Sequence, residues 1–320
     1  MLSMRRVAPF RLVALALVWG LTACQRHVPP AAAPMPMASA PAAPVALAGS
    51  AASAIARGAP EDSPQALMQE AFPDWRGDHP YLVSLAGPDP KGHDVKMVAM
   101  SPAQVLALDA THRVLAVTGT ISDDAGNPAG SHAEPGNLGA YWFELRGGRW
   151  FVTHRRDSIL WQGSNGEVGT VKQADLGPRR RALIVESGWC GQGYCVVGLD
   201  VLEIGSDAAS LVLADAALSS ESLGVAEGCK EMLEGAKDLA PATSQALTPD
   251  NCFDIGGKWR IAPRADSDRG DVVIDFDGQE LVEDPATHAK SVHNVAESVV
   301  FRYSGDGYKQ SDGRNPNHTV

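Results

Sequence analysis

The sequence predicts a mainly β fold, in which an antiparallel sheet with hairpins and a few short helices forms a sandwich- or barrel-like domain. The clearest observation is a hairpin pattern, because residues 141–145 and 150–154 are rich in aromatic side chains and flank a Gly-Gly turn. A second pair of β-favouring runs, 181–186 and 196–204, flanks a glycine-rich segment with two cysteines. Further runs of β-branched and apolar residues predict strands at 112–121, 210–214, 258–261, 272–276 and 298–303.

Short helices are predicted at two Ser-Pro pairs, at 63–64 and 101–102. In each pair the serine can cap a helix whose first residue is the proline. Pro73 ends the first of these helices. A third helix is predicted within residues 222–240, and the last eleven residues are polar and predicted to fray.

Length and charge restrict the class of protein. The chain has 320 residues and a formal net charge of -11, and residues 61–320 are predicted to form a single β-rich globular domain. The first 23 residues contain three arginines and no acid, so their removal would leave a charge of -14. This excess of acidic residues argues against nucleic acid as a partner.

The N-terminus has the parts of a secretory leader. Three arginines among the first eleven residues precede an apolar run at 12–21, which is too short to span a bilayer. The Leu-Thr-Ala-Cys at 21–24 resembles the lipobox of bacterial lipoproteins. The resemblance implies a signal peptide at 1–23 and a Cys24 that carries acyl chains such as palmitate. An ordinary signal peptide that happens to contain a cysteine is the alternative.

Residues 24–60 combine this cysteine with an alanine- and proline-rich stretch of almost no charge. Such a composition cannot form a core and predicts an extended tether. In the lipoproteins that this leader resembles, an aspartate after the acylated cysteine retains the protein in the inner membrane. Gln25 in that position therefore implies a lipid anchor in the outer membrane, facing the periplasm.

The remaining cysteines, Cys190, Cys195, Cys229 and Cys252, form an even set in an exported chain, which predicts two disulfides. Three pairings are possible, and the spacing favours Cys190–Cys195 and Cys229–Cys252. Zinc is the weaker alternative, because Cys-x4-Cys without a second close Cys/His pair is poor zinc spacing.

No catalytic residue stands out. Ser164 lies in Gly-Ser-Asn-Gly, which lacks the Gly-x-Ser-x-Gly elbow of hydrolases. His288 and His293 are five residues apart, whereas His293 and Glu297 have the i,i+4 spacing of helical metal ligands. Without a predicted helix at that place, the spacing favours solvent-exposed histidines.

A calcium loop is a weak alternative near Asp266, Asp268 and Asp271. The Asp-x-Asp start is typical of oxygen-ligand loops. Gly270 stands where a third acid is expected, and Arg269 places a positive charge within the pattern. The sequence therefore favours a charged turn and no bound cofactor.

The segment 187–194 is the strongest candidate for molecular recognition. Its Gly and Ser residues cannot fill a core, yet it carries Trp189 directly before Cys190, and Gln192 and Tyr194 between Cys190 and Cys195. Aromatic side chains on a stiffened loop are typical anchors of protein interfaces. The alternative is that Trp189 folds back onto the sheet as a core residue.

Residues 304–308, Ser-Gly-Asp-Gly-Tyr, resemble the Ser-Gly-x-x-Tyr loop of periplasmic lysozyme inhibitors. In that family the loop enters the catalytic cleft of the enzyme, which implies a binding role for Tyr308. The first functional hypothesis is therefore a binding module for an unknown periplasmic or secreted protein, such as an inhibitor or immunity partner of an envelope-targeting enzyme. The alternatives are a structural or assembly lipoprotein of the outer membrane and a hydrolase with no recognisable motif.

Overall fold

The fold was analysed in a computed structural model, which describes residues 61–77, 79–89, 91, 94–225, 228–234, 252–286 and 290–318. These residues belong to one compact unit, Ala56–Val320. The predicted leader and tether, with Cys24, lie outside the described residues, as does His288. Within this part of the chain, no helix has the length and apolar character needed to cross a bilayer.

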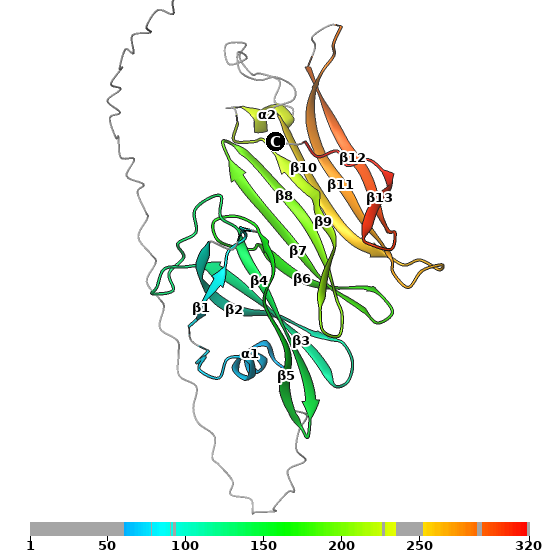
Figure 1. Cartoon of the computed structure of the whole chain (residues 1–320). Helices are drawn as coiled ribbons and strands as arrows, with labels where there is room; N and C mark the ends of the chain where they lie inside the picture. Colours follow the sequence, from blue (N-terminus) through cyan, green and yellow to red (C-terminus); the bar gives the residue numbers. More distant parts are fainter. Residues whose placement is uncertain are drawn as a thin grey trace, which may run out of the picture. The chain divides into compact units, whose positions relative to one another are not determined.

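Two antiparallel sheets make up the structure, which confirms the predicted fold class (Figure 1). In both sheets, strands that follow each other in the chain are also neighbours in the sheet. The five-stranded sheet contains β1 (Tyr81–Ala86), β2 (Val95–Ala107), β3 (His112–Ile121), β4 (Gly136–Arg146) and β5 (Arg149–Gln162). The eight-stranded sheet contains β6 (Thr170–Gly177), β7 (Arg180–Gly191), β8 (Tyr194–Ile204), β9 (Ala209–Glu221), β10 (Phe253–Ala262), β11 (Asp271–Glu283), β12 (Lys290–Tyr303) and β13 (Tyr308–Gly313).

Three large apolar clusters form the core. The outer face of the five-stranded sheet is covered by α1 (Pro64–Ala71), which is capped by the Ser63 side chain as predicted. The inner face packs against β6, β7 and β8, with Trp142 fully buried between the sheets. The eight-stranded sheet curls so that side chains from all its strands enclose a core of their own.

Strands at the centre of these layers are buried on both faces. In β7, Leu183 and Val185 pack between the sheets, whereas Ala182 and Ile184 face the core of the curled sheet. A strand covered on both faces has no solvent side, so its sequence is a continuous apolar run and does not alternate. This explains why 182–185 is the least polar stretch of the predicted hairpin.

The predicted helix at 101–106 is wrong, because these residues lie within β2. Pro102 lacks an N–H and would interrupt the pairing of a central strand. Here β1 pairs only with residues up to Met100, so no strand on that side needs the missing donor. On the other side, the pairing with β3 shifts between Pro102 and Gln104, which accommodates the proline in a bulge.

The predicted fraying of the last eleven residues is also wrong up to His318. Residues 308–313 form β13, and the chain beyond it packs on β9 and β10. The Asn315 side chain donates a hydrogen bond to the Ala217 carbonyl over 2.8 Å, and the His318 ring stacks on Phe253 at 4.0 Å. Polar side chains can therefore fasten a terminus by pairing with backbone groups of neighbouring strands.

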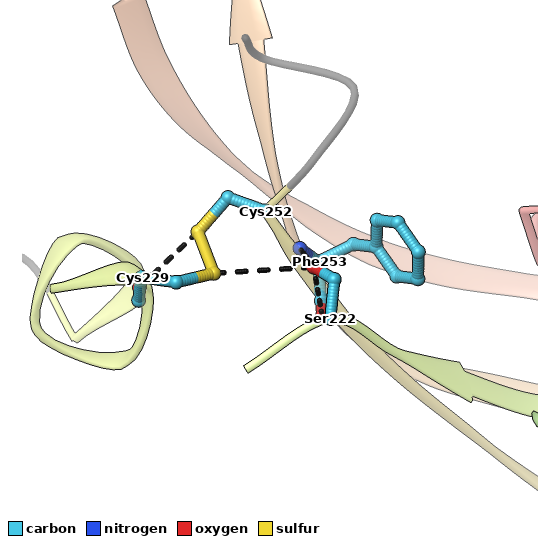
Figure 2. Close-up of a disulfide and its surroundings, with 4 residues drawn as sticks. All are labelled: Ser222, Cys229, Cys252 and Phe253. Carbon is cyan, nitrogen blue, oxygen red and sulfur yellow. Dashed lines mark hydrogen bonds between the residues drawn. A yellow bond between two sulfur atoms is a disulfide. The ribbon is translucent and has the colours of Figure 1, made fainter. Parts of the chain in front are cut away.

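Both predicted disulfide pairings are confirmed. Cys229–Cys252 joins α2 (Cys229–Leu233) to the residue before β10 (Figure 2). Beside this bridge, the buried Ser222 hydroxyl accepts a 2.8 Å hydrogen bond from the Phe253 N–H. The bridge and the serine together hold the start of β10 against the end of β9.

Candidate binding pocket beside the β7–β8 hairpin

The segment 187–194 is the end of a hairpin and not the eight-residue loop that the sequence predicts. β7 continues to Gly191, β8 begins at Tyr194, and only Gln192 and Gly193 form the turn. Both turn residues have positive φ, 53° and 88°, as two-residue hairpin turns require. Cys190 and Cys195 are directly paired across the two strands with their Cα atoms 4.0 Å apart, so the disulfide closes the hairpin end.

Trp189 is 42% exposed, so the alternative that it is a core residue is wrong. Its ring lies over Gly191, where a Cβ atom would come within 2.4 Å of the indole. The His132 ring approaches edge-on at 6.3 Å. Gln192 is also exposed, at the turn itself. Two of the predicted binding residues, Trp189 and Gln192, are therefore exposed to solvent.

The other two predicted binding residues belong to the core of the curled sheet. Tyr194 is half-buried and its ring lies 6.2 Å from that of Phe253. Tyr308 is only 6% exposed, and its hydroxyl donates to the Gly270 carbonyl at 2.9 Å. Burial raises the pKa of Tyr308 to about 12. Tyr308 thus packs inward against the core of the curled sheet.

Trp189 lines a pocket of about 260 Å³. The residues come from the end of β5 and from β7, β8 and β9, and three of them are glycines, so much of the wall is backbone. The full set is Gln162, Gly163, Ser187, Gly188, Trp189, Val196, Gly198 and Asp215. Ser164, the rejected hydrolase candidate, donates from Oγ to the Gly188 carbonyl at 2.8 Å and ties the β5–β6 connection to this wall.

Asp215 lies over β8 because position 198 is a glycine. A Cβ atom at Gly198 would come within 2.5 Å of the Asp215 carboxylate. Asp215 has a left-handed backbone, with φ at 47°, in a stretch where the β8–β9 register shifts. Aspartate is one of the few residues other than glycine that adopts this conformation readily. The Asp215 N–H donates to Asp200 Oδ1 over 2.8 Å, which holds the irregular backbone in place.

Asp200 is a buried acid beneath this pocket. It is 2% exposed, and its second carboxylate oxygen has no hydrogen-bond partner. Burial is the main cause that raises the pKa of Asp200, and the charge of Asp215 adds to it. The hydrogen bond from the Asp215 N–H, and to a smaller extent the Gln162 side chain, partly offset the rise in this pKa. Asp200 therefore acts as a positioning residue whose two polar neighbours, Asp215 and Gln162, both line the pocket.

The raised pKa predicts a pH dependence of stability. The folded state holds the Asp200 proton more tightly, so the free energy of unfolding should fall as pH rises from the unfolded pKa of about 4 to the folded pKa. Asp200→Asn should remove this part of the pH dependence of the free energy of unfolding. Urea unfolding at a series of pH values measures the change. Asp74→Asn, at an exposed acid after α1, is the control. An unchanged pH profile in Asp200→Asn would contradict the prediction.

Each carboxylate of the weak calcium alternative is already paired with an arginine. The pairs are Asp266–Arg264, Asp268–Arg180 and Asp271–Arg302. Guanidinium groups occupy the oxygens that a calcium ion would need. Among the residues that the structure describes, no three or more His, Cys, Asp or Glu side chains are arranged to hold a metal ion. His293 and Glu297 lie on strand β12 and not on a helix.

A second pocket, of about 330 Å³, lies at the opposite end of the β7–β8 hairpin. It contains His112, Glu144 and His154 from the five-stranded sheet. The pKa of Asp109, also in its wall, is lowered to about 2, chiefly by the Thr111 N–H and further by His112, whose Nδ1 lies 2.8 Å away. Glu144 in the same pocket has a different partner, because its carboxylate pairs with Arg146.

Sequence reasoning missed Gln162, Asp200 and Asp215. A signal was present for the two aspartates, because each interrupts an apolar strand, Leu-Asp-Val at 199–201 and Ala-Asp-Ala at 214–216. A charged residue in such a run indicates either an edge or a special environment. Comparison of the chain with known proteins found no matching protein family, no matching curated protein and no matching solved structure.

Proposed function

We propose that this chain is a lipid-anchored envelope protein that binds another protein through the exposed end of its β7–β8 hairpin. The partner is a periplasmic or secreted protein, and the proposed role is that of an inhibitor or immunity partner of an envelope-targeting enzyme. The observation that carries the proposal is Trp189, an exposed indole beside a pocket on a disulfide-closed hairpin.

The surroundings of Trp189 support an interface. Tryptophan is enriched among the residues that dominate protein binding energies, and it contributes a large contact area with a polar N–H. The Cys190–Cys195 bridge and the bond from Ser164 to Gly188 hold the hairpin in one conformation before binding. Such preorganisation reduces the entropy that a complex must lose when it forms.

The membrane part of the proposal rests on the leader. Leu-Thr-Ala-Cys at 21–24 supports acylation of Cys24, and the alanine- and proline-rich stretch after it supports a tether to the outer membrane. Fatty-acid labelling of cells is expected to mark the wild-type protein and not Cys24→Ala. Label that persists in Cys24→Ala would contradict the anchor.

Site-specific photo-cross-linking tests the binding face. A photoreactive phenylalanine derivative in place of Gln192 is expected to give a discrete protein adduct in the cell envelope. The same derivative in place of Asp74, on the side of the molecule covered by α1, is the control and should give none. Trp189→Ala should reduce the adduct at position 192, because loss of an interface tryptophan weakens binding by about 2 kcal/mol or more.

The proposal fails under two outcomes. An adduct at position 192 that is equally strong in Trp189→Ala would show that the indole is not an anchor. Absence of any adduct at position 192, in envelopes where the full-length protein is present and oxidised, would remove the hairpin end as the binding face.

A further inference from the structure

The pocket beside Trp189 combines an open aromatic ring with a carboxylate. We propose that it binds the guanidinium group of an arginine side chain on a basic protein surface, between the Trp189 ring and the Asp215 carboxylate. The identity of the partner as a protein rests on the proposed function above, but the chemistry of the pocket does not. An arginine suits these two groups because its planar head stacks on aromatic rings and pairs with carboxylates in a fork geometry.

The Asp215 carboxylate is exposed and lacks a cation of its own. Among the described lysines, arginines and histidines, none forms an ion pair with Asp215, whereas the exposed acids Asp266 and Asp268 are each paired with an arginine. Its left-handed backbone, which is uncommon for a residue other than glycine, is held by a buried acid, and its side chain lies over a glycine. Backbone conformations of this kind concentrate at ligand sites.

The Trp189 ring is held in place by neighbouring residues, but no charged side chain stacks on it. Gly191 supports it from the strand, and His132 contacts it edge-on. The cation–π contacts in the described part of the chain involve Trp150, Phe72 and Tyr303, and none involves Trp189. The exposed part of this indole is therefore open to a cation that comes from outside the chain.

The rest of the pocket can satisfy the remaining donors of a guanidinium group. Arginine carries five N–H donors and no acceptor, so it needs several oxygens around it. Gln162 and Ser187, which carry an amide and a hydroxyl group, both line the pocket. Gly163, Gly188 and Gly198 bear no side chains, which leaves the volume of about 260 Å³ open to a long side chain.

Charge at long range favours the same kind of ligand. The formal net charge of the chain is -11, which attracts basic surfaces and repels acidic ones. A guanidinium group is thus preferred over a carboxylate or phosphate both by the pocket and by the molecule around it.

A peptide titration tests this proposal on the full-length oxidised chain. The probe is acetyl-Gly-Arg-Gly-amide, and its matched control carries citrulline, which has nearly the same shape as arginine but no charge. The readout is the ¹⁹F resonance of 5-fluorotryptophan at position 189, assigned among the seven tryptophans by its loss in Trp189→Phe. We expect a saturable shift with the arginine peptide and an affinity about tenfold lower for the citrulline peptide.

Asp215→Asn is the decisive variant, because asparagine also adopts the left-handed backbone and keeps the shape of the side chain. It should weaken binding of the arginine peptide about fivefold at low salt. Asp74→Asn, which changes net charge equally at a distant exposed acid, should leave the affinity unchanged. Equal binding of both peptides, or an unchanged affinity in Asp215→Asn with a wild-type melting curve, would overturn the proposal.

Failure of this proposal and failure of the proposed function give different results. If the arginine peptide does not bind while the adduct at position 192 forms and depends on Trp189, the guanidinium pocket is wrong and the protein-binding face stands. If the peptide binds through Asp215 while no adduct forms, the pocket stands and the binding function is wrong.

Discussion

Trp142→Ala is expected to lower the free energy of unfolding by about 3–5 kcal/mol, as large-to-small substitutions of buried tryptophans do. Trp142 is 1% exposed and fills the layer between the two sheets. Its indole N–H donates to the Gly205 carbonyl over 2.9 Å, so the substitution creates a cavity and also removes a hydrogen bond between the sheets. Urea denaturation followed by far-UV circular dichroism measures the change.

Trp189→Ala is the matched control, since it removes the same side chain from an exposed site. Surface substitutions usually change stability by no more than about 0.5 kcal/mol, so its melting curve should stay close to that of the wild type. A loss in Trp189→Ala as large as that in Trp142→Ala would make Trp189 a structural residue and remove the main support for the binding face.

Removal of the Cys229–Cys252 disulfide is the second large effect that we expect. The two cysteines are 23 positions apart, and by the loop-entropy estimate a bridge of this span stabilises a fold by about 3 kcal/mol. Both cysteines are fully buried near Ser222, Cys229 in α2 and Cys252 directly before β10 (Figure 2). The double substitution Cys229→Ala with Cys252→Ala should therefore lower the melting temperature clearly.

The Cys190–Cys195 bridge provides the comparison. It spans five positions and links two strands that already pair along their length, so its removal should have the smaller effect on stability. Thermal unfolding of both double-alanine variants, in the absence of reductant, shows which of the two has the lower melting temperature. A larger loss for the Cys190/Cys195 variant would contradict the assignment of Cys229–Cys252 as the main covalent support of the fold.

Local sequence patterns were sufficient to predict most of the helices and strands. The Gly-Gly turn between aromatic runs predicts the β4–β5 hairpin, and Ser63 followed by Pro64 predicts the start of α1, because these signals depend on neighbours within a few residues. Of the three possible pairings of the four cysteines, the one that the spacing favours is the one that the structure contains. The errors at 101–106 and at the C-terminus arose where a partner distant in the chain decides the conformation.

The sequence by itself determined that the domain is β-rich, where most strands lie and how the four cysteines pair. Only the tertiary structure decided that Trp189 faces outward while Tyr194 and Tyr308 pack inward, since exposure depends on which sheet covers each face. It also brought Gln162, Trp189 and Asp215 into one pocket. These residues come from β5, β7 and β9, and no local signal encodes the packing of one sheet on another, because that packing is set by the summed burial of side chains distant in the chain.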